Sequence, residues 1–427
     1  MINKKYFGLA ILTSVYFVLI FFLDLYFYNF ENNYFWCVSA NFFENIDRYL
    51  PVHCDEGPYL QASQNLEYFF SENNPYQKRP LYVFSIFLSR NIARIITFGM
   101  LSNYMEFKIG MIFVQYVILF LISVNSIKFL KIEKLNLNNS LLIFLVFSIP
   151  NIRWNLFFPS HGNITLLLLL FSLNKLVDET FFTSKNFIYY LFLGFAAMFH
   201  RTAIVFGILL ILIRLYKNTT NYRSSILGFL YLLIPSFLYE AFFLISDYKS
   251  FDWNREIYGQ FYWLLDAFLG RKVIYHDSTC QQLNIFLKCN FQVTKYFILY
   301  FVIGIIYLLV YLLKNRWVFK DENYFFLIIL SLFTYVFWSL QGLYPNFRFI
   351  NYSIGYFLFL SLIYISSKNG PNIILNISIL LYEVSILYME PYSITYFNPN
   401  YLTYISILFF IVSLLPFKMN KVGVLDE

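Results

Sequence analysis

The sequence predicts an all-α integral membrane protein with about 11–13 transmembrane helices. Its 427 residues are 59% hydrophobic and 13% charged, whereas soluble proteins contain about 25% charged residues. Apolar runs of about 17–25 residues recur from one end of the chain to the other, which is the length a helix needs to cross a bilayer. We therefore expect residues 1–427 to form a single polytopic membrane domain.

Twelve apolar runs are candidate spans, each bounded by charged or turn-forming residues. In chain order they cover residues 6–28, 108–128, 140–158, 163–177, 187–199, 203–216, 225–246, 296–313, 323–341, 347–366, 372–389 and 401–417. The first run is too long for the core of a signal peptide and no small-residue cleavage site follows it, so we expect a retained span. The fifth and sixth runs are short and form a re-entrant pair in an alternative interpretation.

The lysine and arginine clusters predict the orientation of the spans. They precede the first span, follow the second, sixth, eighth and tenth spans, and end the chain. With both termini in the cytoplasm, all of these clusters lie inside. Two long loops, residues 29–107 and 247–295, are then outside. No basic block stands clear of the membrane, so a nucleic-acid partner is not expected.

The four cysteines all fall in these two loops, one pair in each. We expect the disulfides Cys37–Cys54 and Cys280–Cys289, because an outer compartment is oxidising. Four free thiols are the alternative.

The first outer loop contains two predicted helices. One begins at Gly57-Pro58, because proline favours the first helical position. The apolar residues on one face of this helix are Tyr59, Ala62, Leu66, Phe69 and Phe70. The second covers residues 81–101, where polar residues (Ser89, Arg90, Arg94 and Thr97) form one stripe. We interpret the second as an amphipathic helix lying in the outer membrane interface.

Acidic residues are the first candidates for chemistry. Asp55 and Glu56 precede the first loop helix, whose positive end favours negative charge. A carboxylate there can act as a general base, which is worth about 10²–10⁴ in rate; a solvated helix start is the alternative. Glu240 and Glu383 fall inside predicted spans, where acids are functional candidates by default.

Six arginines are expected on the outer side, against the positive-inside trend. They are Arg79, Arg90, Arg94, Arg153, Arg201 and Arg348. Guanidinium groups match phosphate oxygens with two donors, so as a set these residues suggest a phosphate-binding surface. For any single arginine, anchoring in the interface is the alternative.

The four histidines, His53, His161, His200 and His276, also lie outside or at the outer boundary. Together with Asp55 they are candidates for a divalent metal site. No metal-binding spacing supports that site, so we expect surface histidines.

The pattern Asp55-Glu56-x-x-Tyr59-x-x-Ala62, followed by Arg79-Pro80-Leu81-Tyr82, resembles the first-loop signature of the GT-C superfamily of membrane glycosyltransferases. The similarity is to bacterial relatives of the protein O-mannosyltransferases and of the lipid A aminoarabinose transferase. It extends through Pro159-Ser160-His161-Gly162-Asn163, His200-Arg201-Thr202-Ala203 and Arg348, over roughly residues 1–360. Position 163 is Asn where many relatives have an acid, and a soluble periplasmic domain is absent.

The resemblance implies inverting transfer of a sugar from a polyprenyl-monophosphate donor to a lipid, glycan or protein acceptor. The site would face the extracytoplasmic side of a bacterial cytoplasmic membrane. Asp55 would be the base or would orient the acceptor, and Glu56 would support it; both are candidate ligands of a divalent metal ion. Arg79, Arg201 and Arg348 would hold the departing phosphate, with Arg90 and Arg94 as further candidates.

Two other functions stay open. A secondary transporter or lipid flippase would centre on Glu240 and Glu383, but the sequence halves show no similarity and the polar residues gather at one face. A polysaccharide polymerase or ligase would use a pyrophosphate-linked glycan, and Asp55 would matter less.

Overall fold

A computed structural model describes most of the predicted helical regions. The described residues are 4–27, 56–71, 74–153, 156, 162–178, 187–217, 222–246, 248, 269, 294–295, 298–299, 301–339, 347–368, 372–387 and 401–414. Every regular element within them is a helix, which confirms the all-α prediction. Asp55, the four cysteines and three of the histidines (His53, His161 and His276) lie outside the described residues, so their predicted roles stay predictions.

Eleven of the twelve predicted spans correspond to single helices with ends within a few residues of the prediction. They are α1 (Lys4–Phe27), α5 (Asn103–Phe129), α8 (Gly162–Val177), α10 (Ile188–Ala197), α11 (Thr202–Lys217), α12 (Tyr222–Ile245), α16 (Val302–Lys314), α17 (Glu322–Ser339), α18 (Phe347–Lys368), α19 (Ile373–Leu387) and α20 (Tyr401–Leu414). The start of α5 is fixed by a cap, because the Met105 amide donates to the Ser102 hydroxyl at 3.3 Å.

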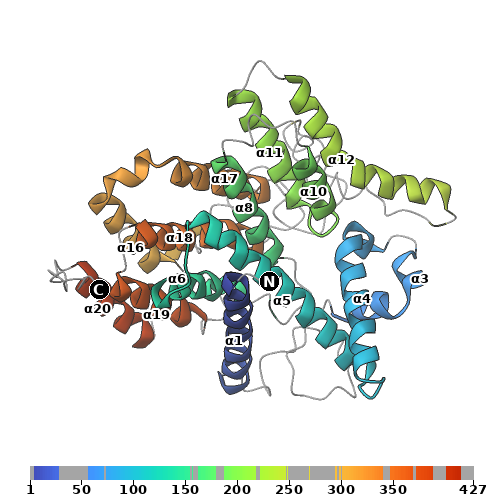
Figure 1. The fold of residues 1–427 in the computed structure, drawn as a ribbon, viewed down its shortest axis with the longest axis horizontal. Coiled ribbons are helices and arrows are strands. Elements are labelled where there is room, and N and C mark those ends of the chain that lie inside the picture. Colours follow the sequence, from blue (N-terminus) through green and yellow to red (C-terminus); the bar gives the residue numbers. More distant parts are fainter. Residues whose placement is uncertain are drawn as a thin grey trace.

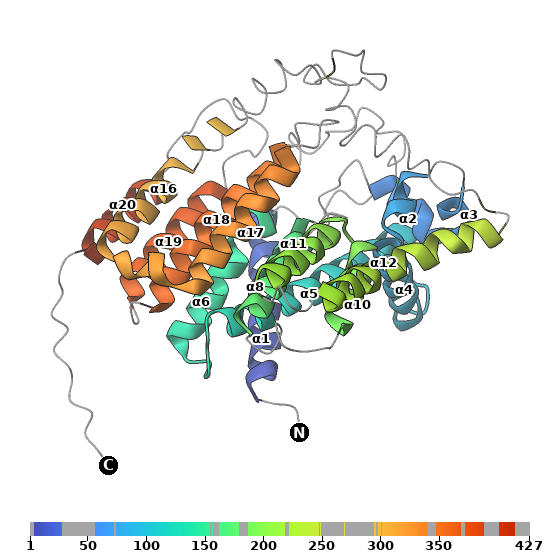
Figure 2. The same cartoon turned by 90° about the horizontal axis from the view of Figure 1, so that it is seen from above.

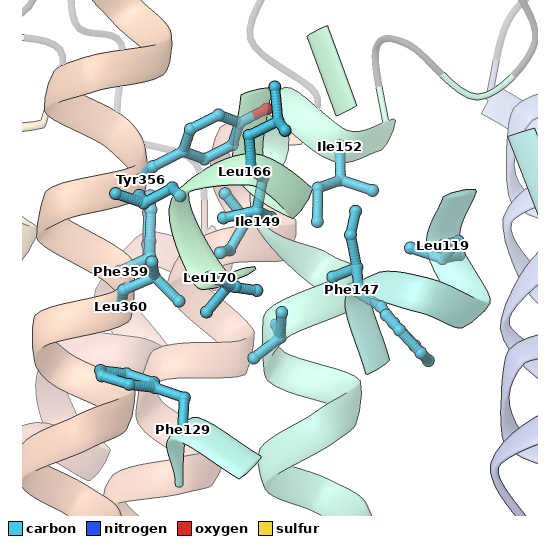
Figure 3. Close-up of a cluster of buried hydrophobic side chains, with 14 of the residues drawn as sticks. Leu119, Phe129, Phe147, Ile149, Ile152, Leu166, Leu170, Tyr356, Phe359 and Leu360 are labelled. Carbon is cyan, nitrogen blue, oxygen red and sulfur yellow. The ribbon is translucent and has the colours of Figure 1, made fainter. Parts of the chain in front are cut away.

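The predicted span 140–158 is wrong as a continuous helix. The chain forms α6 (Leu137–Ser148) and then the short α7 (Pro150–Arg153), with Ile149 between them. Pro150 lacks an amide donor and its ring clashes with the preceding turn, so α6 ends before it. Figure 3 shows Leu166 and Leu170 of α8 and Tyr356 and Phe359 of α18 gathered around Ile149 at this break.

Two groups of helices flank α5 and α8 (Figure 1). One group contains α10, α11 and α12, and the other contains α16, α18, α19 and α20. Figure 2 shows the same division from above, with α1 near the middle of the molecule. The helices of the predicted outer loop are α2 (Glu56–Gln64), α3 (Leu66–Phe69), η2 (Pro75–Lys78) and α4 (Pro80–Ile96). They lie beside α5 and the end of α12, while η5 (Arg316–Lys320) links α16 to α17.

The outward faces of several helices are apolar. By length and composition, Asn103–Phe129 and Arg223–Ile245 are long and apolar enough to cross a membrane. On α5, Ile109, Phe113, Val117 and Leu121 are all exposed at four-residue intervals, and α1 presents a similar stripe. Water-soluble monomers rarely expose apolar patches of this size, so these faces fit lipid better than water.

The amphipathic helix expected at 81–101 is present as α4, but its polar side is placed differently from the prediction. Ser89 and Arg90 are buried, whereas Phe84, Leu88 and Ile92 are exposed. The outward face of α4 is therefore apolar, and its buried polar residues point into the protein. The reason is close packing on α5, where a Cβ atom added to Gly110 would lie only 2.6 Å from the backbone nitrogen of Arg90.

This contact predicts that Gly110→Ala destabilises the protein. The added methyl group would press on the backbone of α4 at 2.6 Å, and such overpacking costs about 1–3 kcal/mol. The measurement is the free energy of unfolding, or the melting temperature, in detergent micelles. Gly57→Ala is the matched control, because a Cβ atom at Gly57 has no neighbour within 4 Å. Equal stability of the two variants would show that α4 and α5 are not in close contact.

Candidate functional site

The start of α4 lies against the turn between α10 and α11. The Leu81 amide donates a hydrogen bond to the Met198 carbonyl oxygen at 3.3 Å. Arg79 and Arg201 both act electrostatically on the imidazole of His200. The two motifs predicted at residues 79–82 and 200–203 are therefore neighbours, although more than a hundred residues separate them.

His200 is the buried centre of this arrangement. It is 3% exposed, and its Nδ1 atom contacts the hydroxyl group of Thr202. Burial lowers the pKa of His200 well below its usual value, and the positive charges of Arg79 and Arg201 lower it further. His200 is thus a neutral ring within electrostatic range of two guanidinium groups, and the expectation that it is a surface histidine is wrong.

Arg79 connects this cluster to α2. Its Nη1 atom donates to the hydroxyl oxygen of Tyr59 at 3.1 Å. The rings of Tyr59 and Tyr82 then meet edge to face, with 5.5 Å between their centroids. Tyr59 and Ala62 of α2 and Phe69 of α3 are buried, so these predicted apolar residues face inward, although the single predicted helix is divided in two. The acidic motif Asp55-Glu56 is at the start of α2, just before Tyr59, which binds Arg79.

A chain of buried polar groups continues from Tyr82 into the interior. Gln115 Nε2 donates to the Tyr82 hydroxyl, and Asn163 Nδ2 donates to Gln115 Oε1, both at 3.2 Å. The Tyr356 hydroxyl donates to the Gly162 carbonyl oxygen, also at 3.2 Å. These bonds join α4, α5, α8 and the middle of α18. Sequence analysis missed Gln115 and Tyr356; an amide in the middle of an apolar span was the available signal for Gln115.

Arg90 does not belong to this cluster. Its Nη2 atom lies 3.5 Å from the Glu106 carboxylate, and the two side chains are 5% and 2% exposed. Its other hydrogen bonds go to the Ser63 carbonyl and the Asn103 side chain, each at 3.0 Å. The guanidinium charge is already neutralised, so the phosphate-binding role expected of Arg90 is replaced by a structural one.

The remaining arginines of the predicted phosphate-binding set are not placed in this cluster. Arg94 is exposed on the last turn of α4, about 22 Å along the helix from Arg79. Arg348 lies in the first turn of α18, about 12 Å along that helix from Tyr356. The side chains of Glu56, Arg153 and Arg348 lie outside the described residues. Of the expected phosphate-binding set, Arg79 and Arg201 are the two that lie within electrostatic range of His200.

The two acids proposed for transport lie in different surroundings. Glu240 is half-buried near the end of α12 and follows Tyr239, whose hydroxyl donates to the Gln77 carbonyl at 3.0 Å. It therefore lies beside the outer-loop helices. Glu383 is fully buried in α19, which packs against α6, α7, α18 and α20. Only Glu240 is close to the Arg79 segment.

Comparison with known protein families, curated proteins and solved structures finds no match. The function is therefore argued from the site itself. Two guanidinium groups, a neutral imidazole and a line of amide and phenol groups can bind a phosphorylated, hydroxyl-bearing ligand. Among the described residues, no three His, Cys, Asp or Glu side chains are grouped as metal ligands.

The burial of His200 predicts a loss of stability in acid. Its pKa is lowered in the folded protein, so the unfolded chain takes up a proton near pH 6.5 while the folded protein does not. The contribution of neutral, buried His200 to the free energy of unfolding is fully present above about pH 6.5. It is lost as the pH falls, by at most about 1.4 kcal/mol per pH unit. The melting temperature measured from about pH 7.5 to 5.5 should fall less steeply for His200→Gln than for the wild type. The three other histidines are the same in both proteins, so parallel curves would contradict this account.

Proposed function

We propose that this chain is a membrane glycosyltransferase that moves a sugar from a polyprenyl-monophosphate donor to a lipid, glycan or protein acceptor. The observation that carries the proposal is the convergence of four separate segments. Tyr59, the segment 79–82, Asn163 and the segment 200–202 are linked by the contacts described above. These are segments through which the sequence resembles GT-C enzymes, and a common site explains why they are neighbours.

We place the protein in a bacterial cytoplasmic membrane, with the site at the extracytoplasmic side. The apolar outward faces of α1 and α5 support insertion. Three contacts support the alternating topology, because they join helix ends that the lysine and arginine clusters assign to the cytoplasm. They link Lys5 to the Ile132 carbonyl, Asn174 to the Asn125 carbonyl, and Asn376 to Asn138.

The arginine pair matches the charge that develops during transfer. When the bond between the sugar and the phosphate breaks, the electron pair stays on the phosphate oxygen and free polyprenyl phosphate leaves. Arg79 and Arg201 would bind and neutralise that phosphate, with Arg348 as a third donor. Neutral His200 lies within electrostatic range of both guanidinium groups and adds no third positive charge.

Asp55 would act on the acceptor. It precedes α2 by one residue, and Tyr59 on the same helix holds Arg79 at 3.1 Å. An acceptor hydroxyl would attack the sugar from the face opposite the phosphate and give its proton to Asp55, so the configuration inverts. Glu56 would support Asp55. The carboxylates of both residues suit a hard divalent cation, which would add positive charge beside the phosphate; the steps above use protein groups only.

The proposal predicts which arginines matter for release of polyprenyl phosphate. Purified protein in lipid nanodiscs would be incubated with a panel of undecaprenyl-phosphoryl hexoses and pentoses and crude membrane acceptors. Arg79→Ala and Asp55→Asn should each lower the release rate by about 10²-fold or more, since they remove charge stabilisation or the base. Arg94→Ala is the matched control and should stay within about twofold, because Arg94 is exposed at the far end of α4.

Two results would count against the proposal. If the wild type, Arg79→Ala and Asp55→Asn released polyprenyl phosphate at equal rates, the roles proposed for Arg79 and for Asp55 would both be wrong. If the protein used a pyrophosphate-linked glycan and none of the monophosphate donors, the polymerase or ligase hypothesis would be favoured instead.

A further inference from the structure

Glu383 is a buried acid that the proposed reaction does not use. It lies in α19 with 0% of its surface exposed, and neither carboxyl oxygen has a hydrogen-bond partner among the residues that the structure describes. Glu106 is almost as buried, at 2% exposed, but it is paired with Arg90. Buried carboxyl groups normally have such a partner, so we expect Glu383 to bind a ligand that takes the place of one.

The position of Asn376 shows which way Glu383 faces. The two residues are seven apart, which is close to two helical turns, so they lie on one face of α19. Asn376 donates to the Asn138 side chain of α6 at 3.2 Å and accepts a hydrogen bond from Ser366 of α18. Glu383 therefore lies on the face of α19 that is turned toward α6 and α18, about 10 Å farther along the helix.

The helices around Glu383 offer few ionisable groups. α6 and α20 contain no charged residue, and α7 and α18 carry their charges at helix ends. The charged groups on the elements packed against α19 are the cations Arg153, Arg348 and Lys368. The phenols are Tyr382 on α19 itself, Tyr352, Tyr356 and Tyr364 on α18, Tyr401 and Tyr404 on α20, and Tyr307 of α16, whose ring contacts that of Tyr382. None of the described side chains donates to Glu383, and α19 has no other acid.

A proton is the ligand that suits this position. An ionised carboxylate without donors is strongly unfavourable in an apolar interior, whereas the protonated group is neutral. We propose that Glu383 is a proton-binding site, occupied while α19 packs on α6 and α18 and emptied only when α19 moves away from them. The packing of α19 is thereby coupled to the proton concentration. This site is separate from the arginine cluster and does not depend on the glycosyltransferase proposal.

A hydrophobic carbodiimide tests whether the proton is present. The carboxyl proton moves to one carbodiimide nitrogen while the carboxyl oxygen bonds to the central carbon, and the adduct rearranges to a stable N-acylurea with no leaving group. Dicyclohexylcarbodiimide would be added to the full chain in micelles at about pH 7, and labelled peptides would be quantified by mass spectrometry. Glu383 should be labelled at least about tenfold more than Glu106, which is nearly as buried but is paired with Arg90.

Glu383→Gln gives a second measurement, because glutamine has a similar shape but does not titrate. Between about pH 6 and pH 9, the melting temperature of the wild type should fall more steeply than that of Glu383→Gln, since only the wild type must keep a proton. Absence of labelling at Glu383, or equal labelling by a water-soluble carbodiimide, would overturn the proposal. So would parallel melting curves for the two proteins.

Discussion

The buried ion pair between Arg90 and Glu106 is the contact on which the position of α4 depends. It lies where α4 crosses α5 and where Gly110 lets the two backbones approach. Breaking one partner of a buried pair is strongly destabilising, because it leaves the other charge uncompensated. With α4 held at this crossing, its first turn meets the turn at Met198 and Tyr82 reaches Gln115. The ion pair therefore positions Arg79 without taking part in the site.

The site and the Glu383 region show two ways of burying polar groups among apolar helices. Around Arg79, the network consists of the side chains of Tyr59, Arg79, Tyr82, Gln115 and Asn163. Each of them forms a hydrogen bond with a residue of another segment, so the network joins segments that are distant in sequence. Such a network specifies one arrangement of helices. Within the described part of the chain, Glu383 has no such partner. On the proposal made above, its neutrality depends on a proton, which makes the packing of α19 sensitive to alkaline pH.

Three differences between expectation and structure have local causes. Pro150 interrupts the third span, a break that the run of apolar residues conceals. Ser89 and Arg90 of the polar stripe of α4 are buried, while Arg94 is exposed, because Glu106 offers Arg90 a partner that a helix lying alone in the interface would lack. His200 is buried because the turn after α10 is covered by the start of α4, which the hydrogen bond from Leu81 to Met198 fixes.

The sequence by itself determined the helices, because the length of an apolar run and the residues that end it act over a few neighbours. It also singled out the segments around Tyr59, Arg79, Asn163 and His200 as candidates. Only the tertiary structure decided which arginines share a site, since ion pairing depends on distances between residues far apart in the chain. It placed Arg79 and Arg201 within electrostatic range of the buried His200, paired Arg90 with Glu106 and left Arg94 exposed.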